Sequence, residues 1–145
     1  VPLMIGADIR NLNPEMEKLL LNRELIRIDQ DPECRPPYLV GKRSVMVPEE
    51  DRENALEPLR AVKDQLYTFI KHLSDNEFVI AYYNLFDEER EVSCIFADAG
   101  VPYTSGYGFA MRDIFTGENL GVKKDYYIVS VPGHDCRLFL CRLAK

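Results

Sequence analysis

The sequence contains no tryptophan, only two histidines and no surplus of positive charge. Its 18 lysines and arginines are outnumbered by 24 aspartates and glutamates, which gives a formal net charge of −6. Nucleic acids and anionic lipids are bound mainly through clustered basic side chains. No apolar run approaches the ~18 residues that a transmembrane helix needs. We therefore expect neither a nucleic-acid partner nor a membrane partner.

Metal-ligand spacings are also missing. Neither His72 nor His134 lies near a cysteine at ligand spacing, and no two cysteines form a C-x-x-C pair. We therefore expect no metal and no other cofactor. Free cysteines are usually buried, so we expect reduced and mostly buried thiols. The four cysteines are Cys34, Cys94, Cys136 and Cys141.

The motifs of common enzyme classes are absent as well. There is no G-x-S-x-G, no G-x-x-x-x-G-K-[ST] and no H-E-x-x-H. Glycosidases use two carboxylates about 5–10 Å apart, but nothing local would raise the pKa of one aspartate and not of another. We interpret the aspartates outside loops as helix caps and members of structural ion pairs, with Asp8 paired to Arg10. They are Asp8, Asp29, Asp31 and Asp113.

Tyrosines offer a second kind of candidate site. Several of them could form a flat platform for sugar rings, which would make the chain a carbohydrate-binding module. Aromatic residues on strands are more often core residues or cross-strand pairs, and the lack of tryptophan weakens the platform further. The tyrosines concerned are Tyr82, Tyr83, Tyr103, Tyr107, Tyr126 and Tyr127.

The length of 145 residues suits one domain and is too short for a complete (β/α)₈ barrel, which needs about 250 residues. The chain divides into three zones, residues 1–32, 33–64 and 65–145. In the first zone, residues 1–6 form an apolar run that predicts a buried strand. Asn13-Pro14 is typical of a helix start, and Asn22 suits either the end of that helix or the cap of a second one over residues 23–28.

The second zone is irregular and rich in proline. We expect an edge strand near residues 38–40 and a short helix around residues 54–62. The charged run at residues 49–53 is interpreted as the solvated face of a loop.

The third zone holds all but one of the fifteen phenylalanines and tyrosines, which favour strands. Residues 77–86 are apolar at both odd and even positions, so both faces of this strand are apolar and a central position is predicted. Residues 89–96 alternate between polar and apolar side chains and predict a strand with one buried face. Because most connections are short, we expect consecutive strands to be antiparallel neighbours. The predicted strands are 65–73, 77–86, 89–97, 107–115, 126–131 and 136–143.

The first zone carries a family resemblance. Residues 2–10 read P-L-M-I-G-A-D-I-R, and residues 22–32 read N-R-E-L-I-R-I-D-Q-D-P. They resemble the "P-L-M-x-[GS]-x-D-[LI]-R" and "N-[KR]-[ED]-[VL]-I-A-[VI]-[ND]-Q-D-P" patterns of the melibiase family. These are the α-galactosidases and α-N-acetylgalactosaminidases of glycoside hydrolase family twenty-seven.

The third zone resembles the β-domain with which that family closes. Residues 69–75, F-I-K-H-L-S-D, are similar to its "V-W-x-[KR]-P-L-S-D-G", and residues 111–117, M-R-D-I-F-T-G, to its "V-x-D-L-W-T-G". Residues 80–84 and 129–140 match further patterns of that domain. The chain departs from the family at Phe69 and Phe115, which replace tryptophans, and at His72, which replaces a proline.

The resemblance implies a fold and a function. The fold is mainly β: an antiparallel, sandwich-like C-terminal domain preceded by the last strand and helix of a (β/α)₈ barrel. The parent would be a retaining glycoside hydrolase of terminal α-galactosides, and its carbohydrate substrate would bind in the missing barrel. The family's catalytic aspartates lie in "K-x-D" and "W-N-D-P-D" contexts, which this chain lacks, so no catalytic residue is carried over.

Structural roles remain for the motif residues Asp8, Arg10, Asn22, Gln30 and Asp31. Asp8 and Arg10 would fix the loop after the last barrel strand. The alternative is a stand-alone carbohydrate-binding or assembly domain. An orphan barrel strand would leave open edges, so self-association is also expected.

Overall fold

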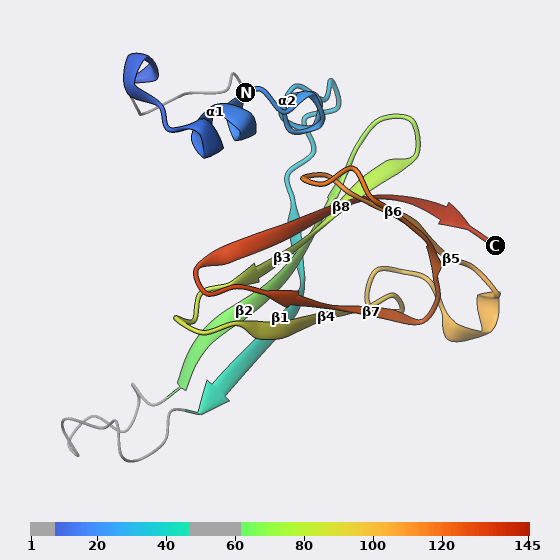
Figure 1. Cartoon of the computed structure of the whole chain (residues 1–145). Helices are drawn as coiled ribbons and strands as arrows, with labels where there is room; N and C mark the ends of the chain where they lie inside the picture. The colour runs from blue at the N-terminus through green and yellow to red at the C-terminus, as the bar shows by residue number, and fades with distance from the viewer. Residues whose placement is uncertain (1–7, 47–61) are drawn as a thin grey trace.

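The computed structural model describes residues 8–46 and 62–145. The chain is mainly antiparallel β-structure with two short helices (Figure 1). A six-stranded sheet in the order β1-β2-β3-β8-β5-β6 is joined by a two-stranded sheet, β4-β7, and the two form a sandwich. The elements are η1 (Ile9–Asn11), α1 (Pro14–Leu20), α2 (Arg23–Asp29), β1 (Tyr38–Met46), β2 (Val62–His72), β3 (Glu77–Asn84), β4 (Arg90–Ile95), η4 (Tyr103–Ser105), β5 (Gly108–Asp113), β6 (Asn119–Lys123), β7 (Tyr126–Val131) and β8 (Asp135–Ala144).

One bent ribbon connects the two sheets. β3 pairs with β8 as far as Asn84 opposite Asp135, and the ribbon then continues with β4 paired to β7 from Arg90 opposite Val131. The expectation that consecutive strands pair is therefore wrong for β3 with β4 and for β7 with β8. It is confirmed for β2 with β3. It is wrong for β5 and β7, because β5 pairs with β6, a strand that was not expected, and with β8.

Asn84 explains why the ribbon bends instead of folding into hairpins. Its buried amide nitrogen donates to the carbonyls of Glu88, Val131 and Pro132 at 2.7, 2.9 and 3.0 Å. Its amide oxygen accepts from the backbone N–H of Phe86 at 2.9 Å. One side chain thus satisfies backbone groups of both arms where the ladder is interrupted. The arms approach so closely that a Cβ at Gly133 would lie 2.0 Å from a carbonyl oxygen.

The main core lies between the two sheets. Tyr82 and Phe139 from the large sheet pack edge to face with 5.6 Å between ring centroids, and Phe96 packs on Phe109 at 4.3 Å. The predicted alternation after residue 89 is confirmed: Val92 and Cys94 are buried, and the glutamates and serine between them are exposed.

A smaller core lies on the outer face of the six-stranded sheet. Leu73, Val79, Ile114 and Leu140 form it, and Leu25 and Ile28 of α2 pack against them. β3 therefore has apolar neighbours on both faces, which confirms its predicted central position. Leu25 and Ile28 are only partly buried, and neither α1 nor α2 contains a fully buried residue.

The first two zones match in part. The helix start at Asn13-Pro14 is confirmed by α1, and the expected edge strand at 38–40 is the first part of β1. The sequence did not reveal β6, an exposed edge strand. The expectations for residues 1–6 and 49–53 lie outside the described residues, as does the helix expected at 54–62 apart from Val62, which begins β2.

The four thiols are free. Cys94 and Cys141 are buried, Cys136 is half-buried and Cys34 is exposed. Within the described ranges, no three His, Cys, Asp or Glu residues gather into a metal-binding group. No helix of this part of the chain is both long and apolar enough to cross a membrane.

Candidate functional site

The motif residues of the first zone meet the β-sandwich through α2. At its N-terminus, the Asn22 side-chain oxygen accepts from the backbone N–H groups of Glu24 and Leu25 at 3.0 and 3.2 Å. The Asn22 amide nitrogen donates to the carbonyl of Ile114 at 3.1 Å. Of the two roles that the sequence left open, Asn22 is the helix cap. The same side chain also ties the helix to the turn after β5.

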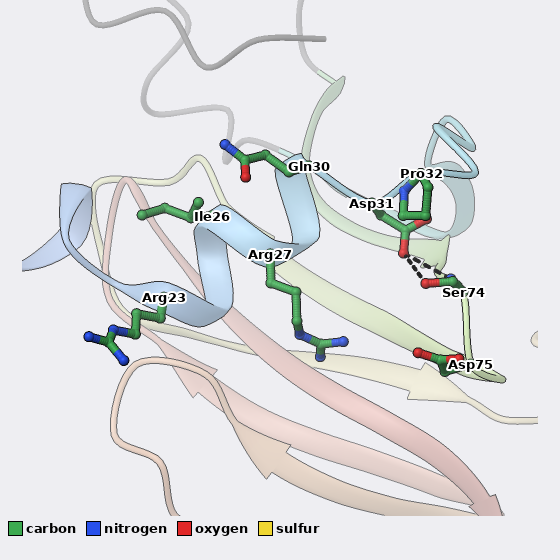
Figure 2. Close-up of a pocket in the computed structure, with 8 residues that line it drawn as sticks. All are labelled: Arg23, Ile26, Arg27, Gln30, Asp31, Pro32, Ser74 and Asp75. Atoms are coloured by element: carbon green, nitrogen blue, oxygen red, sulfur yellow. Dashed lines mark hydrogen bonds between the residues drawn. The ribbon is translucent and has the colours of Figure 1, made fainter.

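Asp31 anchors the other end of the helix. Its buried carboxylate accepts from the backbone N–H and the hydroxyl of Ser74 at 2.9 and 2.7 Å, as Figure 2 shows, and from the backbone N–H of Glu33 at 3.1 Å. The hydrogen bonds from Ser74 hold the pKa of Asp31 below its ordinary value of 3.8. The Asp-Pro end of α2 is thereby clamped to the turn between β2 and β3.

Five charged side chains bridge the space between these two anchors. Glu77 of β3 is buried and forms two ion pairs. Its carboxylate oxygens lie 2.6 Å from a guanidinium nitrogen of Arg27 in α2 and 2.8 Å from one of Arg142 in β8. Glu24 receives Arg112 of β5 at 2.9 Å and Arg27 at 3.5 Å. Burial alone would raise the pKa of Glu77, but its hydrogen bonds to the two arginines outweigh burial and lower it. The charges therefore hold α2 across three strands of the sheet.

The other motif residues lie elsewhere. Asp8 and Arg10 pair with each other at η1, with 2.9 Å between a carboxylate oxygen and the guanidinium Nε, and both are exposed. Arg10 lowers the pKa of Asp8. Gln30 is exposed at the end of α2. The structure thus gathers Asn22, Gln30 and Asp31 on one helix, whereas Asp8 and Arg10 hydrogen-bond to each other instead of to that group.

The remaining sequence candidates serve the fold. Asp113 is buried and accepts from the backbone N–H groups of Phe115 and Thr116, so it closes the turn after β5. Asp29 has one buried carboxylate oxygen without a hydrogen-bond partner among the described residues. His134 is exposed and lies 2.6 Å from Asp87.

The tyrosines do not share one surface. Tyr82 is fully buried between the sheets, and burial raises the pKa of its phenol. Tyr127 packs on Tyr82 and Phe139, whereas Tyr103 and Tyr126 are exposed. The six tyrosines are therefore divided between core and surface.

Sequence reasoning missed the charged members of the junction. Glu77 opens an apolar strand, and nothing local shows that its partners lie 50 and 65 residues away. The sequence marks Ser74 only as part of a turn, not as the partner of Asp31. The sequence signal for this contact is the presence of two family-like patterns in one chain, the Asp-Pro end of α2 and the Ser-Asp turn.

A hollow of about 410 Å³ lies beside this junction (Figure 2). One wall is a face of α2, and the other is the turn between β2 and β3. It is lined by Arg23, Ile26, Arg27, Gln30, Asp31, Pro32, Ser74 and Asp75.

Solved structures of glycosidases share this fold. Alpha-galactosidase I from Mortierella vinacea superposes with a TM-score of 0.74 at 22% identity, over 97% of this chain and 31% of that one. The alpha-galactosidase of Saccharomyces cerevisiae, determined with raffinose, superposes with a TM-score of 0.77 at 14% identity, over 99% of this chain and 40% of that one.

Sequence relatives are similar along nearly the whole chain. Probable alpha-galactosidase B of Aspergillus clavatus is 26% identical over an alignment of 144 residues, and the match covers 96% of this chain and 31% of that protein. Alpha-galactosidase 3 of Arabidopsis thaliana is 24% identical over 140 residues, 96% of this chain and 28% of that protein. The chain thus spans about three tenths of these relatives. The model of the alpha galactosidase C-terminal beta sandwich domain matches residues 63–141. This match covers more than half of the chain, which therefore belongs to the family of alpha-galactosidase C-terminal β-sandwich domains.

Proposed function

We propose that this chain is the C-terminal portion of a retaining glycoside hydrolase that acts on terminal α-galactosides, and that it supplies structure and not catalysis. The match of residues 63–141 to the C-terminal domain family carries the proposal. Relatives named as α-galactosidases, about three times as long as this chain, support it. Residues 1–32 would be the remnant of the catalytic barrel, residues 33–64 a connecting segment and residues 65–145 the β-domain.

The chemistry that we propose belongs to the missing barrel. A retaining glycosidase needs a nucleophilic carboxylate and an acid–base carboxylate about 5–5.5 Å apart. The nucleophile forms a covalent glycosyl intermediate, which water then hydrolyses. In the described part of this chain, Asp31 and Asp113 are both occupied by backbone hydrogen bonds, and Asp8 is occupied by Arg10. This agrees with a chain that contributes no catalytic group.

The structural role that we propose rests on α2. Asn22, Asp31 and the five-residue ion network fasten this helix to the sandwich. If α2 is the last helix of the barrel, these contacts join the barrel rigidly to the β-domain. The β-domain then supports the last strand and helix of the barrel, which complete the ring of strands.

The test begins with the coding region upstream of Val1, read in frame for about 350 residues. We expect it to encode seven β/α units with both aspartate contexts. The full-length protein should then hydrolyse p-nitrophenyl α-galactoside and release α-galactose first, as NMR of the anomeric proton would show. The 145-residue chain should be inactive. Hydrolysis by the short chain, or an upstream frame without the aspartates, would contradict the proposal.

A further inference from the structure

The hollow beside α2 presents one complete face of that helix. Arg23, Ile26, Arg27 and Gln30 line it at spacings of three and four residues, so they lie in one stripe. Ser74 and Asp75 form the opposite wall. The clamp between Asp31 and Ser74 fixes that wall relative to the helix. The groove is therefore built from two elements whose separation is held by hydrogen bonds.

Only some of its polar groups are occupied within the chain. Arg27 is bound by Glu77 and Glu24, and the Asp31 carboxylate by Ser74. Among the described residues, the side chains of Arg23, Gln30 and Asp75 make no hydrogen bond or ion pair. The groove thus offers a free guanidinium near the start of α2, a free amide at its end and a free carboxylate on the opposite wall.

We propose that this groove receives a polar segment of the preceding part of the same polypeptide, with an acidic side chain against Arg23 and a hydrogen-bond donor against Asp75. This proposal rests on the proposed function, because it needs the preceding barrel. The free charges of the groove define the opposite charges that the segment must carry. The relatives are longer than this chain, so a preceding part of the polypeptide could provide such a segment. None of the described residues that line the groove is aromatic, so they offer a sugar no ring to stack on.

The test compares one substitution in two proteins, the 145-residue chain and the full-length chain. In the short chain, Arg23→Glu changes an exposed side chain without a partner, so the thermal midpoint should stay within about 1 °C. In the full-length chain, the reversed charge would face the docked acidic group, and the midpoint should fall by several degrees. Arg90→Glu is the matched control: Arg90 pairs with exposed Glu88 at the corner of the ribbon, so its effect should be the same in both proteins.

A second measurement reports burial directly. The exposed native thiol is first removed by Cys34→Ser. On this background, a thiol introduced by Gln30→Cys should react with a maleimide at least tenfold more slowly in the full-length protein than in the short chain. The control Glu91→Cys places the thiol on the exposed face of β4, where the two rates should agree. Equal midpoints and equal rates at position 30 in both proteins would overturn the groove proposal. A full-length protein that protects position 30 but does not hydrolyse α-galactosides would instead overturn the proposed function.

Discussion

Glu77 is a buried carboxylate whose charge is balanced from two sides. Arg27 approaches one of its oxygens and Arg142 the other, from a helix and from a neighbouring strand. Both arginines keep part of their guanidinium in water. The carboxylate is therefore the member of this group that depends most on its partners, because a buried charge without compensation is costly.

We expect Glu77→Gln to lower the free energy of unfolding by about 1.5–3 kcal/mol, the range for hydrogen bonds to charged groups. Denaturant unfolding of the 145-residue chain would measure it. Glu88→Gln is the control, since Glu88 forms an exposed pair with Arg90 and such pairs contribute only about 0–1 kcal/mol. Equal losses in the two variants would show that burial gives Glu77 no special weight.

Asn84 is the second buried polar side chain on which the fold depends. Asn84→Ala removes four hydrogen bonds and takes the amide donor away from carbonyls of both arms. Of these bonds, the one to Val131 is fully buried. We expect a loss of about 2–3 kcal/mol in unfolding free energy. Asn119→Ala, on an exposed edge strand, should change it by less than about 0.5 kcal/mol. An Asn84 variant as stable as the wild type would mean that water replaces the amide at the corner.

These residues show how far sequence reasoning reaches. The cap at Asn13 could be predicted, and Asn22 could be narrowed to two roles, because a cap and its helix are neighbours in sequence. The ion pairs of Glu77 and the bonds of Asn84 to Val131 and Pro132 could not, because these partners are 47 to 65 residues away. The resemblance to the melibiase family marked Asp31, but only the fold reveals Ser74 as its partner.

At the scale of elements, α2 depends on its surroundings. A helix of seven residues is not stable alone in water. It is held here by Leu25 and Ile28 in the smaller core and by the carboxylates of Glu77 and Asp31. Both carboxylates have a lower pKa in the folded chain than their ordinary values of 4.5 and 3.8.

This makes the anchoring of α2 sensitive to acid. A lowered pKa stabilises the folded state fully above the ordinary value, and the stabilisation is lost as the pH falls through the lowered value. We expect the denaturation midpoint to fall between pH 5 and pH 3. The Glu77→Gln variant should lose less over this interval, because its side chain no longer titrates. Parallel pH profiles of the two proteins would contradict this assignment.

Strand prediction succeeded where the pattern was local. The limits of β7 were predicted at both ends, and β2, β3, β4, β5 and β8 were found within a few residues. The pairing of strands was less accessible. A short connection fixes the distance between two strand ends but not whether the chain reverses or turns a corner. β6 was missed because its five residues include Gly121 at φ 71° and none that is fully buried.

At the scale of the whole molecule, α1 presents an uncovered apolar surface. Met16 and Leu19 of α1 are 41% and 48% exposed, and Leu21, which caps the end of α1, is 67% exposed. We expect the 145-residue chain to self-associate through this surface, since contiguous exposed apolar residues favour association. Sedimentation velocity should show a weight-average mass that rises with concentration. The double variant Leu19→Glu, Leu21→Glu should stay monomeric, and a sharp monomer for the unmodified chain at high concentration would refute the expectation.

The bent ribbon also affects the rate at which the native state unfolds. Asn84 reaches carbonyls 47 and 48 positions further along the chain, so its bonds close only after the two arms have come together. The entropy of closing that loop is lost before the amide contributes anything. We therefore expect the corner to form late in folding and to break early in unfolding. Under this expectation, the hydrogen bonds of Asn84 slow unfolding more than they speed folding.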